Sequence, residues 1–202
     1  MFSLKLSSCH NHKVAMKNIV YLIPGRGNRL SEIGNMVVSL NLDVYGREML
    51  PPFSTLHFPE QLKIIQKDLT TMFWHNDARL IGHSYGGYLL LQALAELPPF
   101  PGQIILFSPV LGTYMDKKRL YMSRPPRADK LISLTKASRF PLPQYLEIHT
   151  GEDDEGCDPN LAKQIGEYIP CAQVTIIPNQ GHKLPQEYLK IKLCKFLQSK
   201  IL

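Results

Sequence analysis

The sequence GHSYGG at 82–87 places a serine between two glycines, and this spacing is suited to nucleophilic chemistry. A serine at the tip of a tight turn between a strand and a helix has a strained backbone, and only small residues fit two positions before and after it. Gly82 and Gly86 meet that requirement. The turn would raise the Ser84 hydroxyl above a sheet and leave the backbone N–H of Tyr85 free to donate to an oxyanion. The alternative interpretation is a glycine-rich helix cap without chemistry.

A serine hydroxyl is a weak nucleophile at neutral pH and needs a base, and His182 is the best placed of the seven histidines. It lies in the loop that follows the last predicted strand, 173–177. Loops at the carboxyl ends of parallel strands share one sheet edge, so we expect His182 to face Ser84. His83 is interpreted as a packing residue, because its side chain would point away from the turn, and His149 as a buried residue of a strand. The remaining histidines are interpreted as surface residues: His10, His12, His57 and His75.

An acid beside His182 would fix the tautomer of its ring and stabilise the imidazolium ion. Five carboxylates follow the predicted strand 145–150, in the sequence GEDDEGCDP at 151–159. Most of them are expected to lie in a solvated turn, with Asp158 capping the helix that follows. The residues alone do not distinguish which carboxylate would contact the histidine.

These candidate residues lie at the ends of predicted strands, and strands alternate with helices along the chain. Short apolar runs stopped by Pro or Gly indicate buried strands, whereas apolar residues spaced by three and four indicate helices. We therefore predict an α/β fold with a mostly parallel, doubly wound sheet of about six strands flanked by helices. The predicted strands are 18–23, 42–49, 79–82, 103–108, 145–150 and 173–177, and the predicted helices are 31–40, 59–73, 88–97, 161–168 and 185–197.

The chain order of serine, acid and histidine, with the serine in a G-x-S-x-G turn, resembles the α/β-hydrolase superfamily over roughly residues 17–200. In that superfamily a Gly-x-x-Asp pattern often follows this strand and ends in the triad acid. The sequence GEDD at 151–154 fits, so the resemblance implies Asp154, with Asp153 as the alternative. The two N-terminal strands of full-length members have no counterpart, which would make this a compact version. The implied catalytic residues are Ser84, Asp154 and His182.

The sequence IPGRGN at 23–28, at the end of the first predicted strand, also resembles the superfamily. There the residue after the first glycine supplies a second N–H to the oxyanion hole, which implies that Arg26 acts together with Tyr85. Many members carry histidine where this chain has Pro24. Because the implied contribution comes from the backbone, this difference does not remove it.

Positive charge is concentrated in residues 113–140, where the superfamily inserts its lid. This segment holds eight basic and two acidic residues and accounts for the whole net charge of +6. A basic lid would favour an acidic substrate or partner, and the alternative is a solvated basic surface. The predicted organisation is a flexible N-terminal extension, 1–16, followed by one domain, 17–202. The residues predicted to bind an anionic substrate are Lys117, Lys118 and Arg119.

The resemblance implies a serine hydrolase that cleaves carboxylic esters through an acyl-enzyme on Ser84. One alternative is a thioesterase or ester hydrolase that acts on an acidic acyl carrier or acyl-CoA, which the basic segment favours. Another is a non-catalytic interaction module on the same fold. Small-molecule ester or acyl substrates are therefore expected, and no motif for binding nucleic acid is present.

Composition is that of an ordinary globular protein, with 44% hydrophobic and 20% charged residues in 202. No cofactor or metal is expected, because the four cysteines form no C-x-x-C pair and no histidine cluster accompanies them. The cysteines are interpreted as reduced thiols of a cytoplasmic protein. No stretch of the sequence is apolar over the length of a membrane span.

Overall fold

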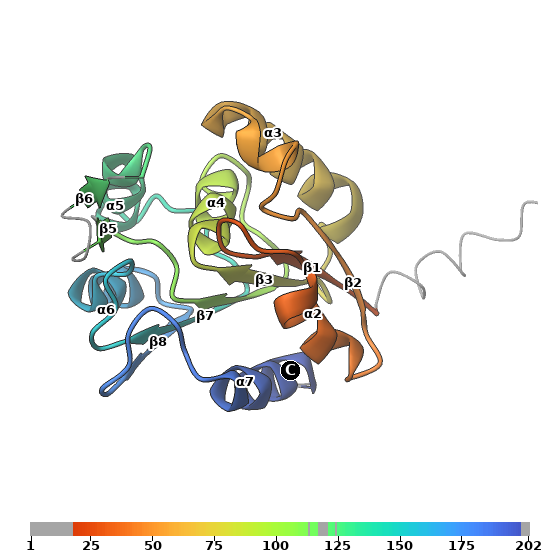
Figure 1. Cartoon of the computed structure of the whole chain (residues 1–202). Helices are drawn as coiled ribbons and strands as arrows, with labels where there is room; N and C mark the ends of the chain where they lie inside the picture. Colours follow the sequence, from red (N-terminus) through yellow and green to blue (C-terminus); the bar gives the residue numbers. More distant parts are fainter. Residues whose placement is uncertain (1–17, 113, 117–120, 124, 199–202) are drawn as a thin grey trace, which may run out of the picture.

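The computed structural model describes residues 18–112, 114–116, 121–123 and 125–198, and it contains one parallel sheet of six strands (Figure 1). The strand order is β2-β1-β3-β4-β7-β8, so consecutive strands are joined by crossovers that carry helices. This confirms the predicted α/β fold. The predicted extension, 1–16, lies outside the described residues. The strands are β1 (Ile19–Ile23), β2 (Asp43–Gly46), β3 (Arg79–His83), β4 (Gln103–Phe107), β7 (Tyr145–Gly151) and β8 (Ala172–Ile177).

Helices cover both faces of the sheet (Figure 1). Four helices pack against one face, and two helices that touch each other pack against the opposite face. The four inner strands, β1, β3, β4 and β7, are largely buried between the helices, which explains their apolar runs in the sequence, whereas the edge strands β2 and β8 are partly exposed. The first group is α3 (Phe58–Asp68), α4 (Tyr85–Leu94), α5 (Ala128–Lys136) and α6 (Pro159–Tyr168); the second is α2 (Ser31–Val38) and α7 (Gln186–Gln198).

Successive side chains of each strand enter different cores, as the period of two in a strand requires. In β1, Tyr21 and Ile23 contribute to the core beneath α3 and α4. Val20 and Leu22 contribute to the core beneath α2 and α7. All four are almost fully buried. Backbone pairing sets the register of the strands and the two cores anchor the sheet between the helices, so that the loops at the carboxyl edge begin from a fixed frame.

The loop after β2 is anchored to the body by an ion pair. Nε and Nη2 of Arg47 each lie 2.6 Å from an oxygen of Asp68, the last residue of α3. The hydroxyl of Tyr21 donates to the same carboxylate at 3.0 Å. Asp68 is 6% exposed, and a buried carboxylate is stabilised only where it is paired in this way. The chain therefore leaves the sheet at Arg47 and does not continue the predicted strand to residue 49.

Several boundaries and one segment differ from the sequence predictions. Helix α4 begins at Tyr85 instead of 88, because the fold requires helix directly after the turn despite two glycines in its first positions. Residues 69–73, predicted as α-helix, form a π-helical turn, η2 (Leu69–Phe73). A short 3₁₀ turn, η1 (Phe53–Thr55), precedes α3. The predicted insert, 113–140, contains an antiparallel pair, β5 (Tyr114–Asp116) and β6 (Tyr121–Ser123), followed by α5.

Candidate active site

Ser84 occupies a strained backbone conformation between β3 and α4. Its φ is 53° and its ψ is −125°, a region that residues with a side chain rarely adopt. Three backbone hydrogen bonds hold it there. Its N–H donates to the carbonyl of Phe107 at 2.9 Å, and its carbonyl accepts from Tyr88 at 3.2 Å and from Val110 at 3.1 Å. The sharp turn that the sequence GHSYGG predicts is therefore present.

The two glycines of the motif lie where no side chain fits. A Cβ atom on Gly82 would come within 2.6 Å of Cα of Gly87. A Cβ atom on Gly86 would come within 2.3 Å of the carbonyl oxygens of Ile23 and Pro24. The same close approach brings the end of β1 against the start of α4. The loop after β1 therefore lies beside Ser84.

His182 connects Ser84 to a carboxylate. Oγ of Ser84 lies 2.8 Å from Nε2 of His182, and Nδ1 of His182 lies 2.6 Å from Oδ1 of Asp154. An ionised carboxylate can only accept hydrogen bonds, so Nδ1 carries the proton. The neutral ring then has its lone pair on Nε2, and the Ser84 hydroxyl donates to it. This arrangement can take the proton of Ser84 as its oxygen attacks an electrophile.

The carboxylate of Asp154 is buried and fully hydrogen-bonded. Its side chain has no exposed surface. Oδ1 also accepts from the backbone N–H groups of Gly156 at 2.8 Å and Cys157 at 2.9 Å, and Oδ2 accepts from Thr150 at 2.7 Å. Burial by itself raises the pKa of this carboxyl, but hydrogen bonds from His182, Thr150 and Gly156 outweigh it and leave the pKa below its usual value. Asp154 is therefore ionised at neutral pH.

Two loops are fastened together so that Asp154 faces His182. The N–H of Asp153 donates to the carbonyl of Gln180 at 2.9 Å, and the N–H of Glu152 donates to the carbonyl of Ile177 at 2.9 Å. A Cβ atom on Gly151 would fall 2.0 Å from the Gln180 carbonyl oxygen, so the loops touch at the backbone. The side chain of Asp153, the alternative acid, is exposed. Asp158 caps α6, as expected, by accepting from the N–H groups of residues 160 and 161.

His83 packs against His182. Among the hydrogen bonds of the described residues, none joins the His83 ring to Ser84 Oγ. The two rings are stacked with their centroids 6.3 Å apart. Burial first, and the nearby His182 second, lower the pKa of His83 to about 4. A ring that stays neutral at pH 7 places no second positive charge beside His182 when that residue becomes protonated.

The two residues predicted to form the oxyanion hole lie beside Ser84. Tyr85 is the first residue of α4, so its N–H has no acceptor within the helix. A Cβ atom on Gly25 would lie 3.5 Å from Ser84 Oγ, which places the loop that contains Arg26 next to the hydroxyl. The Arg26 guanidinium covers the ring of Tyr85, with Cζ 3.9 Å from the ring centroid. The structure thus brings both predicted residues together.

A cavity of about 510 Å³ opens beside this loop. Its wall comes mainly from the segment between β2 and α3, which no motif in the sequence connects with the site. The signal that could have found it is position, since this segment also starts at the carboxyl end of a parallel strand. His57, predicted as a surface residue, is exposed and also lines this cavity. The lining residues are Arg26, Gly27, Met49, Leu50, Pro51, Ser54, Leu56, His57, Phe58, Gln61 and Tyr85.

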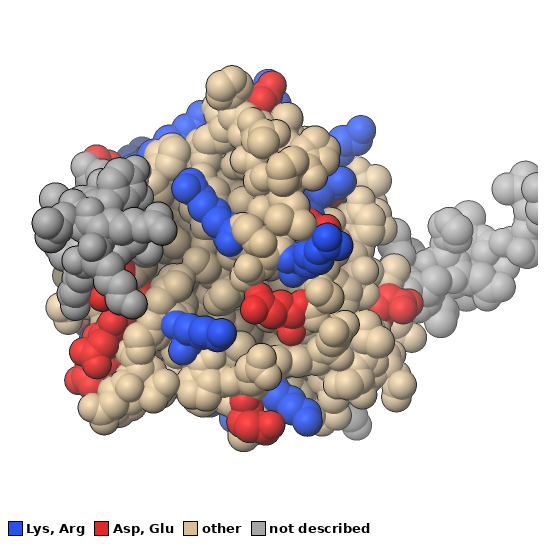
Figure 2. Space-filling model, viewed as in Figure 1, with Lys and Arg blue, Asp and Glu red and all other residues tan. Residues whose placement is uncertain are grey.

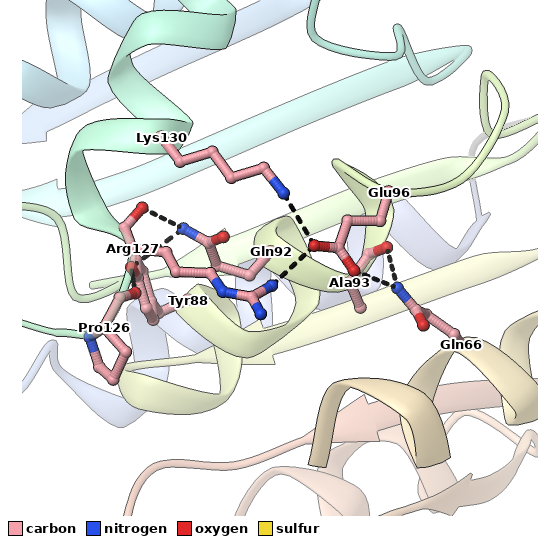
Figure 3. A network of polar contacts seen from close by, with 8 residues as sticks. All are labelled: Gln66, Tyr88, Gln92, Ala93, Glu96, Pro126, Arg127 and Lys130. Carbon is pink, nitrogen blue, oxygen red and sulfur yellow. Dashed lines mark hydrogen bonds and ion pairs between the residues drawn. The ribbon is translucent and has the colours of Figure 1, made fainter. Parts of the chain in front are cut away.

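Helix α5 of the basic insert is attached to the body of the domain through Glu96, which lies in the turn after α4 (Figure 3). Oε1 of Glu96 lies 2.7 Å from Nη1 of Arg127 and 2.8 Å from Nζ of Lys130. Gln66 of α3 donates to the other oxygen at 3.2 Å. Hydrogen bonding from Lys130 is the main reason that the pKa of Glu96 lies below its usual value. Two of the eight basic residues of the insert are therefore paired with the body of the domain.

The insert also contacts the helix that begins at the Ser84 turn. The hydroxyl of Tyr88 donates to the carbonyl of Pro126 (Figure 3). Gln92 donates to the Tyr88 hydroxyl at 2.9 Å and to the carbonyl of Arg127 at 3.1 Å. Tyr88 is 1% exposed, so this contact is part of the core. The predicted role of the insert as a lid stays a prediction, and Lys117, Lys118 and Arg119 lie outside the described residues.

Charge on the face of the molecule that Figure 2 shows is mixed. On the face in Figure 2, the Lys and Arg side chains of the described residues are interspersed with Asp and Glu side chains.

No group of three His, Cys, Asp or Glu side chains within the described ranges could hold a metal ion. None of the helices in that part of the chain is long and apolar enough to span a bilayer. Its three cysteines, Cys157, Cys171 and Cys194, are free thiols.

Solved structures share this architecture at low sequence identity. A monoacylglycerol lipase from Paleococcus ferrophilus superposes with a TM-score of 0.66 at 16% identity, over 89% of this chain and 93% of that one. The carboxylesterase CesB from Bacillus subtilis gives 0.65 at 14%, over 91% and 84%. The esterase EaEST from Exiguobacterium antarcticum gives 0.61 at 14%, over 90% and 92%. No protein-family model and no curated protein matches the sequence. The chain therefore has the α/β-hydrolase fold.

The Ser84 turn predicts a sharp difference between two glycines. Gly86→Ala would place a methyl group against two carbonyl oxygens, so we expect the free energy of unfolding to fall by about 3 kcal/mol or more. Gly34→Ala, inside α2 with no neighbour closer than 3.7 Å, should raise it by about 0.5–1 kcal/mol. Urea denaturation measures both. Equal effects of the two substitutions would contradict the close approach described above.

Asp154 should make stability depend on pH in a predictable direction. Its pKa is lower in the folded protein than in the unfolded chain, so it stabilises the fold above the unfolded value, and this contribution is lost as pH falls through the folded value. Between about pH 5 and about pH 3, the free energy of unfolding should fall more steeply in the wild type than in Asp154→Asn. Asp153→Asn, on the exposed neighbour, should follow the wild type. Parallel curves for all three proteins would show that Asp154 is not held ionised.

Proposed function

We propose that the protein is a serine hydrolase that cleaves carboxylic ester bonds. The observation that carries the proposal is the hydrogen-bonded series Ser84, His182 and Asp154, with contacts of 2.8 and 2.6 Å, at the carboxyl edge of an α/β-hydrolase sheet. Fold alone does not define activity, whereas this geometry supplies a nucleophile, a base and an acid in contact. The esterase and lipase names of the structural neighbours are consistent with it.

In the proposed reaction, Oγ of Ser84 forms a bond to the ester carbonyl carbon while its proton moves to Nε2 of His182. The carbonyl π electrons become the charge of an oxyanion, which accepts hydrogen bonds from the N–H groups of Arg26 and Tyr85. Each such donor is typically worth about 3–4 kcal/mol in the transition state. The ionised Asp154 stabilises the positive ring of His182 during this step.

The tetrahedral intermediate then collapses. The bond to the leaving alkoxide breaks, and that oxygen takes the proton from His182, so that an ester between the acyl group and Ser84 remains. Water attacks this ester as His182 removes one of its protons, and the return of a proton to Ser84 Oγ releases the carboxylic acid. No step needs a cofactor, since every proton is supplied by Ser84, water or His182.

Substitutions in this series give the direct kinetic test. Ser84→Ala should lower kcat/KM for p-nitrophenyl hexanoate by about 1,000-fold or more, because the nucleophile is lost. Asp154→Asn should cost about as much, since it removes the group that fixes the His182 tautomer. Asp153→Asn is the matched control and should change kcat/KM by less than about twofold. Circular dichroism checks that each variant is folded.

Three outcomes would contradict the proposal. Full activity of folded Ser84→Ala would exclude this nucleophile, and a larger loss in Asp153→Asn than in Asp154→Asn would exclude this acid. A folded wild-type protein that hydrolyses none of the esters and thioesters tested would instead support a non-catalytic interaction module.

A second candidate function is hydrolysis of a thioester or ester on an acidic acyl carrier or on acyl-CoA. The observation that favours it is the concentration of the net charge of +6 in residues 113–140. Because Glu96 already pairs with Arg127 and Lys130, recognition would depend on the other basic residues of the segment. The proposed contacts are Lys117, Lys118 and Arg119, as part of a lid.

Salt distinguishes the two candidates. Raising NaCl from about 0.05 to about 0.5 M should lower kcat/KM for a hexanoyl carrier protein much more than for p-nitrophenyl hexanoate, because exposed charges are screened. Simultaneous replacement of Lys117, Lys118 and Arg119 by Ala should lower the ratio of the two kcat/KM values. The same salt response for both substrates would remove the carrier hypothesis and leave the ester hydrolase.

A further inference from the structure

The side chain of Arg26 has a position that the oxyanion hole does not explain. Only its backbone N–H is proposed to act there, yet its side chain covers the ring of Tyr85, and both residues line the 510 Å³ cavity. Among the described residues, no hydrogen bond or ion pair uses this guanidinium. A ring face offers no carboxylate or carbonyl oxygen, so the contact orients the cation and leaves its N–H donors available.

The rest of the cavity lining combines apolar side chains with basic and neutral polar ones. Met49, Leu50, Leu56 and Phe58 supply apolar surface, whereas no Asp or Glu is among the lining residues. No carboxylate of the cavity lining competes for the Arg26 guanidinium, so this side chain can attract an anionic ligand there. This combination fits a molecule with a hydrocarbon chain that ends in an anionic group.

From these observations we infer that Arg26 selects ester substrates that carry a carboxylate at a distance from the scissile carbonyl. The guanidinium would donate two parallel hydrogen bonds to the carboxylate, and the apolar wall would contact the intervening methylene groups. The inference deepens the proposed function and rests on it, since it names a substrate class for the same site. It differs from the carrier hypothesis, because the charge lies within the cavity and outside the basic insert.

The ring of Tyr85 holds this guanidinium in one orientation, so that the direction of its N–H donors is fixed as well as its charge. Stacking at 3.9 Å restricts the arginine side chain, which otherwise loses much conformational freedom on binding a ligand. A lysine at the same place would carry the charge but not the planar pair of donors. Arg26→Lys should therefore recover only part of the selectivity.

Matched substrates test the inference. In the first comparison, mono-p-nitrophenyl adipate and p-nitrophenyl hexanoate share the acyl length and leaving group and differ in the terminal carboxylate. In the second, the butyrate ester of 4-hydroxybutyric acid is compared with butyl butyrate, which moves the charge to the alcohol side. We expect kcat/KM for the anionic ester to exceed that for the neutral one by about tenfold in one of the two comparisons. The comparison that shows the preference identifies which part of the substrate enters the cavity.

Arg26→Met should reduce that preference to about twofold or less, whatever it does to the absolute rates. Arg29→Met is the matched control. It removes the same charge from the same loop, but Arg29 lines a separate hollow between α2 and α7. The preference should persist in that variant and should fall with added salt in the wild type.

The possible failures are distinguishable. If the wild type hydrolyses the neutral esters but prefers the anionic one in neither comparison, the inference is wrong and the proposed function stands. The same holds if Arg26→Met keeps the preference, or if Arg29→Met loses it equally. If folded wild-type protein hydrolyses none of the four esters, both the proposed function and this inference are overturned.

Discussion

The backbone of Ser84 has a positive φ that costs on the order of 1–3 kcal/mol, and the surrounding structure must offset this strain. Three backbone hydrogen bonds, to β4, to α4 and to the loop after β4, fix the residue, and glycines on both sides allow the chain to turn. The close approach at Gly86 has a second consequence. It brings the end of β1 against α4, so that the loop containing Arg26 lies beside the hydroxyl. The tight turn and its close contact with β1 thus place the nucleophile beside the loop that contains Arg26.

A second constraint is the burial of Asp154. A carboxylate without exposed surface must have its oxygens hydrogen-bonded, and the donors come from His182, Thr150 and two backbone N–H groups. The turn after β7 therefore has to be rigid, and backbone contacts between residues 152–153 and the loop after β8 make it so. Since Asp154 accepts the hydrogen bond from Nδ1–H of His182, the lone pair of that ring is on Nε2 and faces Ser84. The tautomer of the base is determined by the packing of two loops.

The sequence predicted the fold well, because buried parallel strands leave continuous apolar runs and because GHSYGG requires a strand before it and a helix after it. The comparisons and the sheet confirm the α/β-hydrolase fold. Other features depend on conformation. Five carboxylates follow β7, and only the turn geometry separates Asp154 from Asp153. Helix α4 was predicted to begin at residue 88, after the two glycines of low helix propensity. It begins at Tyr85, because the tertiary structure outweighs that propensity. The cavity wall between β2 and α3 has no periodicity to reveal it.

The central claim is that Ser84 is a nucleophile activated by His182, and covalent labelling tests it most directly. A fluorophosphonate should react with the wild-type protein to one label per chain, and peptide mass spectrometry should place the label on Ser84. The Ser84→Ala variant should remain unlabelled, and Asp154→Asn should react far more slowly, because the base is then poorly oriented. Labelling of another residue, or none in a folded wild-type protein, would contradict the account.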